Sequence, residues 1–189
     1  MDSEHRHADR GTPLARFAGR ILVVCPRCGG RAVVVPRPGG PELRYDIELL
    51  FLPRRLACAG CGATKEWEPE RRGGARLGVT LGGPAEPFFD RPLWLQVRCA
   101  GHVLWAYDAE HVDALAAYVG ARLRERGCTP SSWDMFPRLP DRTTSAARRE
   151  DVLAGLDTLR ALAGRSAPGD RTDAADGSTT RASRRRVSY

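Results

Sequence analysis

Long apolar runs are scarce in this sequence of 189 residues. None approaches the roughly 20 apolar residues that a membrane-spanning helix needs, so we expect no membrane partner. Residues 1–20 also carry charges where a secretory signal peptide would place its apolar stretch. These absences predict a cytoplasmic protein.

Familiar catalytic patterns are missing as well. The sequence has no G-x-S-x-G, no phosphate-binding glycine loop and no H-E-x-x-H. The glycines in residues 71–78 lack the strand–loop–helix context of a phosphate cradle, and the alternating Glu66, Glu68 and Glu70 fit a solvated face better than a paired-carboxylate site. We therefore predict a protein that is not an enzyme.

Lysine is almost absent, because Lys65 is the single lysine among 30 basic residues. The preference for arginine, with much alanine and glycine, is typical of a GC-rich coding bias, although arginine also suits phosphate recognition. The formal net charge is +7, and six arginines with three aspartates fall in residues 165–189. These residues account for +3 of the charge, and four thiolates with one Zn²⁺ would add −2, which leaves the rest of the chain near +2. The charge permits nucleic-acid binding without requiring it.

Cysteines are few, yet four of the six form two C-x-x-C pairs, "CPRCGG" and "CAGCG". A C-x-x-C turn points two sulfurs to one side, at a separation that fits tetrahedral zinc with Zn–S near ~2.3 Å. A glycine follows each pair, Gly29 or Gly62, and adopts positive φ without steric cost. The pattern predicts a metal site with four ligands: Cys25, Cys28, Cys58 and Cys61.

The 29 residues between Cys28 and Cys58 exceed the usual interval in such sites, and residues 36–52 could lengthen the arms of a hairpin there. Isolated redox pairs or pairs without metal are the alternative. A thioredoxin-type pair would precede a helix, and neither pair here precedes a helical pattern. Because four cysteine ligands leave no open position for water, we expect one Zn²⁺ with a structural role.

These two turns between short strands resemble a zinc ribbon of the transcription-factor type over roughly residues 21–68. The resemblance implies that the four paired cysteines hold a structural zinc. Residues 92–126 and 138–160 further resemble actinobacterial zinc-ribbon-containing proteins, which implies an architecture but no reaction. Rubredoxin shares the Cys-x-x-Cys-Gly turn, so a single electron-transfer iron is the alternative metal.

The chain divides by composition into four segments. Residues 1–18 are polar without periodicity and predict a disordered leader. Short β-branched runs bounded by glycine and proline predict an antiparallel zinc ribbon over 19–70, with a possible further strand at 77–81. A β-hairpin packed with one or two helices follows over 71–164, and 165–189 read as a disordered Arg/Ser-rich tail. The predicted fold class is α+β.

The segment 71–164 carries its own signals. Alternating apolar residues predict a hairpin over 92–107, with residues 99–102 at its turn. Asp108 stands at an N-cap position, and an apolar stripe that includes Leu123 predicts a helix ending at Gly127. A second helix is expected from residue 144 or 145 to 162. The aromatic residues of the hairpin, Trp94, Trp105 and Tyr107, fit a buried sheet better than an exposed platform.

DNA or RNA is the expected partner class. This rests on the zinc-ribbon analogy, on the arginines at 54, 55, 71 and 72, and on the tail "RASRRRVSY". The alternative is a zinc-stabilised adaptor that binds another protein, with Trp67 and Trp133 as candidate exposed contacts. Two weaker hypotheses are an enzyme that uses Cys99 or His102, and a second metal site. The residues of that second site would be Cys99, His102, His111 and Cys128.

Overall fold

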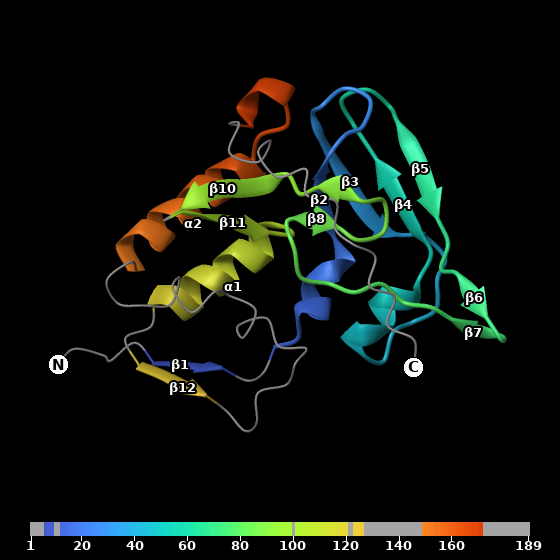
Figure 1. Cartoon of the computed structure of the whole chain (residues 1–189), viewed down its shortest axis with the longest axis horizontal. Helices are drawn as coiled ribbons and strands as arrows, with labels where there is room; N and C mark the ends of the chain where they lie inside the picture. Colours follow the sequence, from blue (N-terminus) through green and yellow to red (C-terminus); the bar gives the residue numbers. More distant parts are fainter. Residues whose placement is uncertain (1–5, 10–11, 100, 121–122, 127–148, 172–189) are drawn as a thin grey trace.

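The computed structural model describes residues 6–9, 12–99, 101–120, 123–126 and 149–171 (Figure 1). Most strands pair antiparallel, and helices are few, so the fold mixes α and β structure as expected. The zinc-ribbon architecture itself and the domain boundaries at residues 18, 70 and 164 stay predictions. Within the described ranges, no helix has both the length and the apolar character to cross a membrane.

A four-stranded antiparallel sheet forms the first layer, and its strand order follows the sequence. Its first two strands are rich in β-branched residues, and its register sets Val34 opposite both Ile21 and Leu56. All three of these side chains are buried. The strands are β2 Ile21–Val24, β3 Arg31–Pro36, β4 Arg54–Ala57 and β5 Thr64–Trp67.

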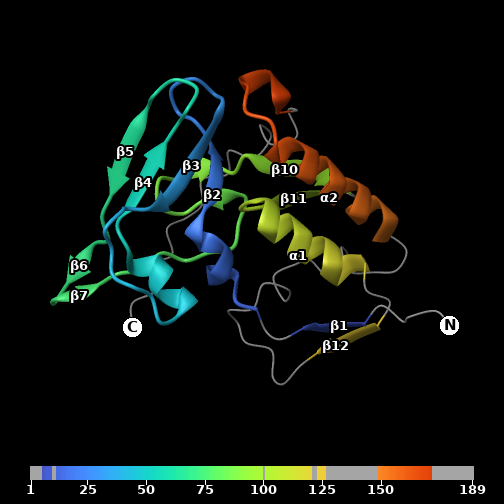
Figure 2. The same cartoon turned by 180° about the vertical axis from the view of Figure 1, so that it is seen from behind.

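The second layer is the hairpin of β10 (Leu95–Cys99) and β11 (His102–Ala106), with two helices packed on it (Figure 2). Its register pairs Cys99 with His102 around the turn, where Gly101 has φ of +82°. The predicted hairpin and turn are therefore confirmed. Trp94 and Tyr107 are fully buried, which confirms their place in the core.

The two layers share one core. The Leu22 N–H donates to the Tyr107 carbonyl, and the Trp94 N–H donates to the Leu22 carbonyl, each over 2.8 Å. An antiparallel bridge between Val23 and Leu93 lies beside them. The edge strand β2 is thus joined by backbone hydrogen bonds to the segments that flank the β10–β11 hairpin.

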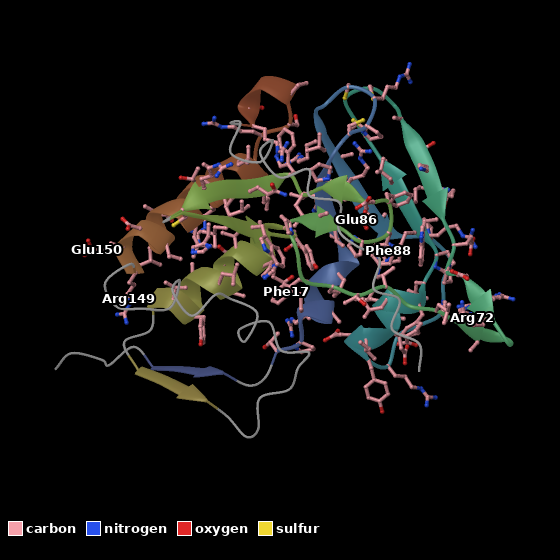
Figure 3. All side chains as sticks on the ribbon, in the orientation of Figure 1. Phe17, Arg72, Glu86, Phe88, Arg149 and Glu150 are labelled. Carbon is pink, nitrogen blue, oxygen red and sulfur yellow. The ribbon has the colours of Figure 1, made fainter. Side chains whose placement is uncertain are left out.

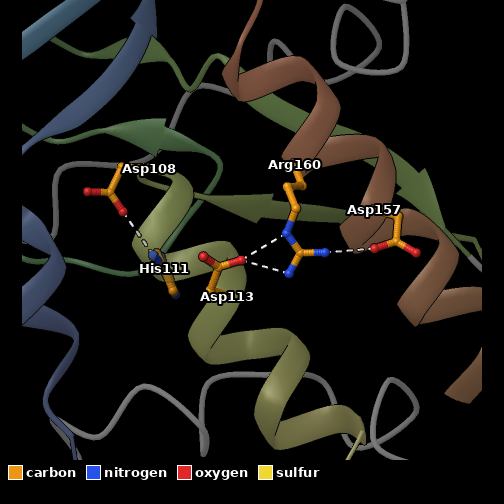
Figure 4. A network of polar contacts seen from close by, with 5 residues as sticks. All are labelled: Asp108, His111, Asp113, Asp157 and Arg160. Carbon is orange, nitrogen blue, oxygen red and sulfur yellow. Dashed lines mark hydrogen bonds and ion pairs between the residues drawn. The ribbon is translucent and has the colours of Figure 1, made fainter.

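The first helix, α1, spans Ala109–Gly120 and begins as predicted. The Asp108 carboxylate accepts the His111 N–H over 2.9 Å, as an N-cap does (Figure 4). The predicted end at Gly127 is wrong. Leu123–Arg126 form strand β12, which pairs in parallel with β1, Arg6–Asp9, so the backbone after Gly120 finds hydrogen bonds outside the helix.

The second helix, α2, spans Arg149–Ala163 and buries the predicted stripe, including Leu156 and Leu159. Its predicted start at residue 144 or 145 lies outside the described residues. α1 and α2 pack against each other. Arg160 of α2 bridges them, since its Nη2 lies 2.6 Å from the Asp113 Oδ1 of α1 (Figure 4).

Three segments differ from the sequence predictions. Residues 14–18 were expected in a disordered leader, but Leu14–Gly19 form a 3-10 helix, η1, that buries four apolar side chains in the core. Residues 43–52 were grouped with the ribbon strands, but Asp46–Phe51 form a second 3-10 helix, η2. Residues 77–81 form no strand. In each case apolar side chains pack into the core without joining a ladder.

The predicted tail is corrected in its first residues. Pro168–Asp170 form a short 3-10 helix, η6, and residues 172–189 lie outside the described part of the chain. Four further strands make two small hairpins. They are β6 Arg71–Arg72 with β7 Ala75–Arg76, and β8 Ala85–Glu86 with β9 Arg91–Pro92.

Candidate metal centre

The first cysteine pair lies in the turn between β2 and β3. The Cys25 N–H donates to the Gly30 carbonyl over 2.8 Å, and the Gly29 N–H donates to the Cys25 carbonyl over 3.0 Å. Gly29 has φ of +73°, the left-handed conformation that was predicted for this glycine. The Arg27 N–H also points to the Cys25 sulfur, at 3.4 Å. The backbone N–H groups of Arg27 and Cys28 in this turn both donate to the Cys25 sulfur.

The second pair repeats this geometry between β4 and β5. The Cys58 N–H donates to the Ala63 carbonyl over 2.9 Å, the Gly62 N–H donates to the Cys58 carbonyl over 2.9 Å, and φ of Gly62 is +71°. The two turns lie at the same end of the sheet, because the strands between them, β3 and β4, are antiparallel neighbours. Pairing of β3 with β4 therefore brings together two cysteine pairs that are distant in sequence.

The four sulfurs converge. Cys25 Sγ lies 3.7 Å from Cys61 Sγ, and Cys28 Sγ lies 3.7 Å from Cys58 Sγ. All four lie within 4.8 Å of one another. A tetrahedral ion with metal–sulfur bonds near ~2.3 Å requires sulfur separations of about 3.8 Å, so the cluster has the dimensions of a four-thiolate metal site. The predicted ligand residues are thus close enough to share one ion.

The protonation of the cluster is uneven. Burial raises the pKa of Cys25, but the Cys28 and Arg27 N–H groups and the neighbouring sulfurs outweigh it and lower the pKa to about 7. For Cys28 the Gly30 N–H lowers the pKa, but the Cys61 sulfur, burial and the Cys58 sulfur together raise it to about 12. Four thiolates this close repel one another, and a bound cation removes that repulsion.

The chain beyond α2 covers the first cysteine turn. The Arg31 N–H donates to the Ser166 carbonyl over 2.9 Å, and the Arg31 guanidinium donates to the Ala163 carbonyl. A Cβ atom on Gly30 would lie 2.8 Å from the Ser166 oxygen, so this contact requires glycine. The first cysteine turn is therefore in direct contact with the C-terminal end of α2 and the residues that follow it.

Two of the other predicted site residues, Cys99 and His111, make contacts inside the fold. The Cys99 thiol donates to the Asp151 carbonyl over 3.4 Å. His111 is buried, stacks on Phe17 and accepts the Tyr107 N–H at Nδ1 over 3.2 Å. Cys128 lies outside the described residues. In the part of the chain that the structure describes, the four paired cysteines are the one group whose geometry could hold a metal.

Two of the arginines proposed for nucleic acid are engaged within the protein. Arg54 is 0% exposed, donates to the Ala18 and Leu49 carbonyls, and lies over the Phe88 ring at 4.4 Å. Arg55 is paired with Glu66 at 2.6 Å. The prediction for Arg54 is wrong, and its position could have signalled this, because it shares the inward face of β4 with Leu56.

Sequence reasoning also missed Glu86, a second buried charged residue. Burial raises its pKa to about 7, although the N–H groups of Phe88 and Phe89 and the nearby Arg54 favour the charged form. Those N–H groups donate to its two carboxylate oxygens over 2.7 and 2.9 Å. Figure 3 labels Glu86 and Phe88. Trp67, expected to be exposed, is half-buried against Phe88, and Trp133 lies outside the described residues.

None of the protein-family models, curated proteins and solved structures compared with this chain matches it significantly. The resemblance to a zinc ribbon therefore rests on the cysteine cluster and its turns. The class that the site defines is a protein with four clustered cysteines that can bind a metal ion.

Proposed function

We propose that the chain binds one Zn²⁺ through Cys25, Cys28, Cys58 and Cys61, in a zinc-ribbon-like module. The convergence of four sulfurs at tetrahedral spacing carries this proposal. Zinc is proposed because paired C-x-x-C turns that supply four thiolates are the usual donor set of a structural zinc site. A cytoplasmic location suits such a centre, since thiols stay reduced there.

The zinc is structural and the protein is not an enzyme. A four-thiolate site has no position left for water, so the metal would not generate a nucleophile. The ion would instead hold the β2–β3 turn against the β4–β5 turn. Metal binding then supplies part of the folding free energy of the sheet.

The function of this module is the binding of nucleic acid. Support comes from the formal charge of +7 and from the arginines at 71 and 72, which are exposed. The arginines at 54 and 55 no longer contribute, because both are engaged within the protein.

A protein-binding adaptor is the second candidate, and one observation favours it. Tyr45, Ile47 and Phe51 of the η2 region are the large apolar side chains that stay exposed in the described chain, with Tyr45 at 69%. A shallow hollow of about 440 Å³ adjoins two of them. Exposed aromatic residues beside a hollow are typical of protein contacts.

Elemental mass spectrometry tests the metal proposal, on protein purified without a metal affinity resin. We expect one zinc per chain. Absorbance at 260 nm on the same sample detects nucleic acid that co-purifies. Zinc with bound nucleic acid supports the proposed function, zinc without it favours the adaptor, and absence of metal contradicts the whole proposal.

A further inference from the structure

The β6–β7 hairpin extends beyond the four-stranded sheet, at the end away from the cysteine turns (Figures 1 and 3). It carries three arginines, Arg71, Arg72 and Arg76, and all of them are exposed. Apolar burial does not explain the hairpin, because both of its strands and both of its turn glycines are exposed. Its conformation and its charges therefore call for another explanation.

The hairpin holds like charges opposite each other. In its register Arg71 pairs with Arg76, and Arg72 pairs with Ala75. Like charges directly opposite on adjacent strands destabilise a hairpin. The turn is nevertheless built for this tight register, since Gly73 and Gly74 have φ of +56° and +85°, the positive values that a type I′ turn needs at both central residues.

Other arginines of this region are neutralised within the protein. Arg37 lies 2.5 Å from Glu68, and Arg55 lies 2.6 Å from Glu66, so two arginines near β5 have acidic partners. Among the described residues, no ion pair or side-chain hydrogen bond involves Arg71, Arg72 or Arg76. Three guanidinium groups therefore lie exposed within the six residues of the hairpin, 71–76.

The base of the hairpin is anchored, so its arginines do not project from a loose loop. The Leu77 N–H donates to the Glu70 carbonyl over 2.7 Å, which extends the ladder by one pair. The Val79 N–H donates to the Leu50 carbonyl over 3.4 Å. A Cβ atom on Gly78 would lie 2.7 Å from the Phe51 ring, so the chain beyond β7 packs closely on η2. These contacts fix the position of the hairpin relative to η2.

We infer that the β6–β7 hairpin is the element that contacts the phosphates of duplex DNA, an inference that rests on the proposed nucleic-acid function. Guanidinium groups match phosphate oxygens in charge and geometry, and a bound phosphate relieves the repulsion between Arg71 and Arg76. A two-stranded ribbon fits the major groove of B-form DNA. Single strands are usually held by base stacking on aromatic residues, and residues 70–77 contain none.

The test compares two triple variants that remove the same charge. Arg71→Ser, Arg72→Ser and Arg76→Ser together remove the hairpin charge. Arg20→Ser, Arg98→Ser and Arg165→Ser remove three exposed arginines elsewhere. Fluorescence anisotropy with a labelled 20-base-pair duplex gives Kd between 50 and 200 mM salt, and zinc content with circular dichroism checks that each variant folds.

We expect the hairpin variant to bind at least tenfold more weakly at the lower salt concentration. The slope of log K against log salt should become shallower by about 2 to 3, because each phosphate contact contributes about 0.9. The control variant should keep most of both quantities. A single strand of the same length should compete less well than the duplex.

The failures of the inference and of the proposed function are distinguishable. If the native chain binds the duplex and both variants weaken it equally, binding is diffuse and the hairpin assignment is wrong. Stronger competition by the single strand overturns the assignment to duplex DNA. If the native zinc-loaded chain binds no nucleic acid even at the lower salt concentration, the proposed nucleic-acid function itself fails, and the inference fails with it.

Discussion

The Arg31 N–H donates to the Ser166 carbonyl over 2.9 Å, and this bond joins the first cysteine turn to the chain that follows α2. Its donor lies three residues after Cys28, and its acceptor lies three residues after the end of α2. α2 in turn packs on α1 and on the β10–β11 hairpin. The cysteine cluster therefore lies where the two layers of the fold pack together.

Gly30→Ala should weaken this junction without removing a metal ligand. The new Cβ would lie 2.8 Å from the Ser166 carbonyl oxygen, so the backbone of residues 166–168 must shift. We expect a loss of about 1 to 3 kcal/mol in unfolding free energy, the usual cost of overpacking, with zinc content unchanged. Urea unfolding followed by circular dichroism measures this loss.

Gly19→Ala is the matched control, since nothing lies within 4 Å of its added Cβ. This variant should keep the native unfolding midpoint. Equal midpoints for Gly30→Ala and the native chain would show that the Arg31–Ser166 contact is not required for stability.

Cys58→Ser should lose the metal, because a serine hydroxyl is a poor replacement for one of four thiolates. The loss should also loosen the sheet, since the ion links the β2–β3 turn to the β4–β5 turn. We expect zinc content to fall well below one per chain and the thermal midpoint to drop. Elemental mass spectrometry and differential scanning calorimetry measure the two effects.

Cys99→Ser provides the comparison, because Cys99 donates to the Asp151 carbonyl and lies apart from the cysteine cluster. It should keep one zinc per chain. Stoichiometric zinc in Cys58→Ser would refute the assignment of the ligands.

The two cysteine turns could be predicted from the sequence because each of them has a local signature. Two cysteines three positions apart, followed by glycine, define the geometry of each turn almost without tertiary context. The meeting of the two turns depends in addition on the pairing of β3 with β4. The same holds for the N-cap at Asp108, whose carboxylate accepts an N–H three residues away. Features that depend on a few neighbouring residues were predicted correctly.

Features that depend on distant partners could not be predicted. Leu123 continues the apolar stripe of α1, but its backbone pairs with Arg6, more than one hundred residues away. Leu14 and Phe17 belong to a short segment without apolar periodicity, and only the assembled core makes their burial favourable. Glu86 gives no sequence signal, because its partners are backbone N–H groups and a buried arginine from β4.

Glu86 should make stability fall as the pH rises from about 4.5 to 7. Burial raises its pKa from 4.5 to about 7, so in this range the folded state binds more protons than the unfolded state. Glu86→Gln keeps an acceptor oxygen and removes the ionisation. We expect the native chain to lose about 2 kcal/mol relative to this variant between pH 5 and pH 7.

Urea unfolding at both pH values measures this difference, with Glu42→Gln, an exposed residue, as the matched control. If the free-energy difference between the native chain and Glu86→Gln is the same at pH 5 and pH 7, the carboxylate is not perturbed by burial in the way described.

His111 should act in the opposite sense on the acid side. Burial lowers its pKa from 6.5 to about 3, so between these values the unfolded state binds more protons and stability is lost as the pH falls. The ring lies against the rings of Phe17, Trp105 and Tyr107, and the nearby Asp108 carboxylate accepts the backbone N–H of His111. Burial of the ring is the cause of the lowered pKa. The folded protein therefore keeps His111 neutral.

His111→Asn removes the titration and keeps an acceptor for the Tyr107 N–H, at the cost of the ring contacts. We expect the native chain to lose about 2 kcal/mol relative to the variant between pH 6 and pH 4. Release of the metal at low pH affects both proteins alike, so the difference between them isolates His111. His102→Asn, a half-exposed histidine in β11, is the control. An imidazole that titrates near its usual pKa by NMR in the folded protein would contradict this account, because the pocket would then accept the charge.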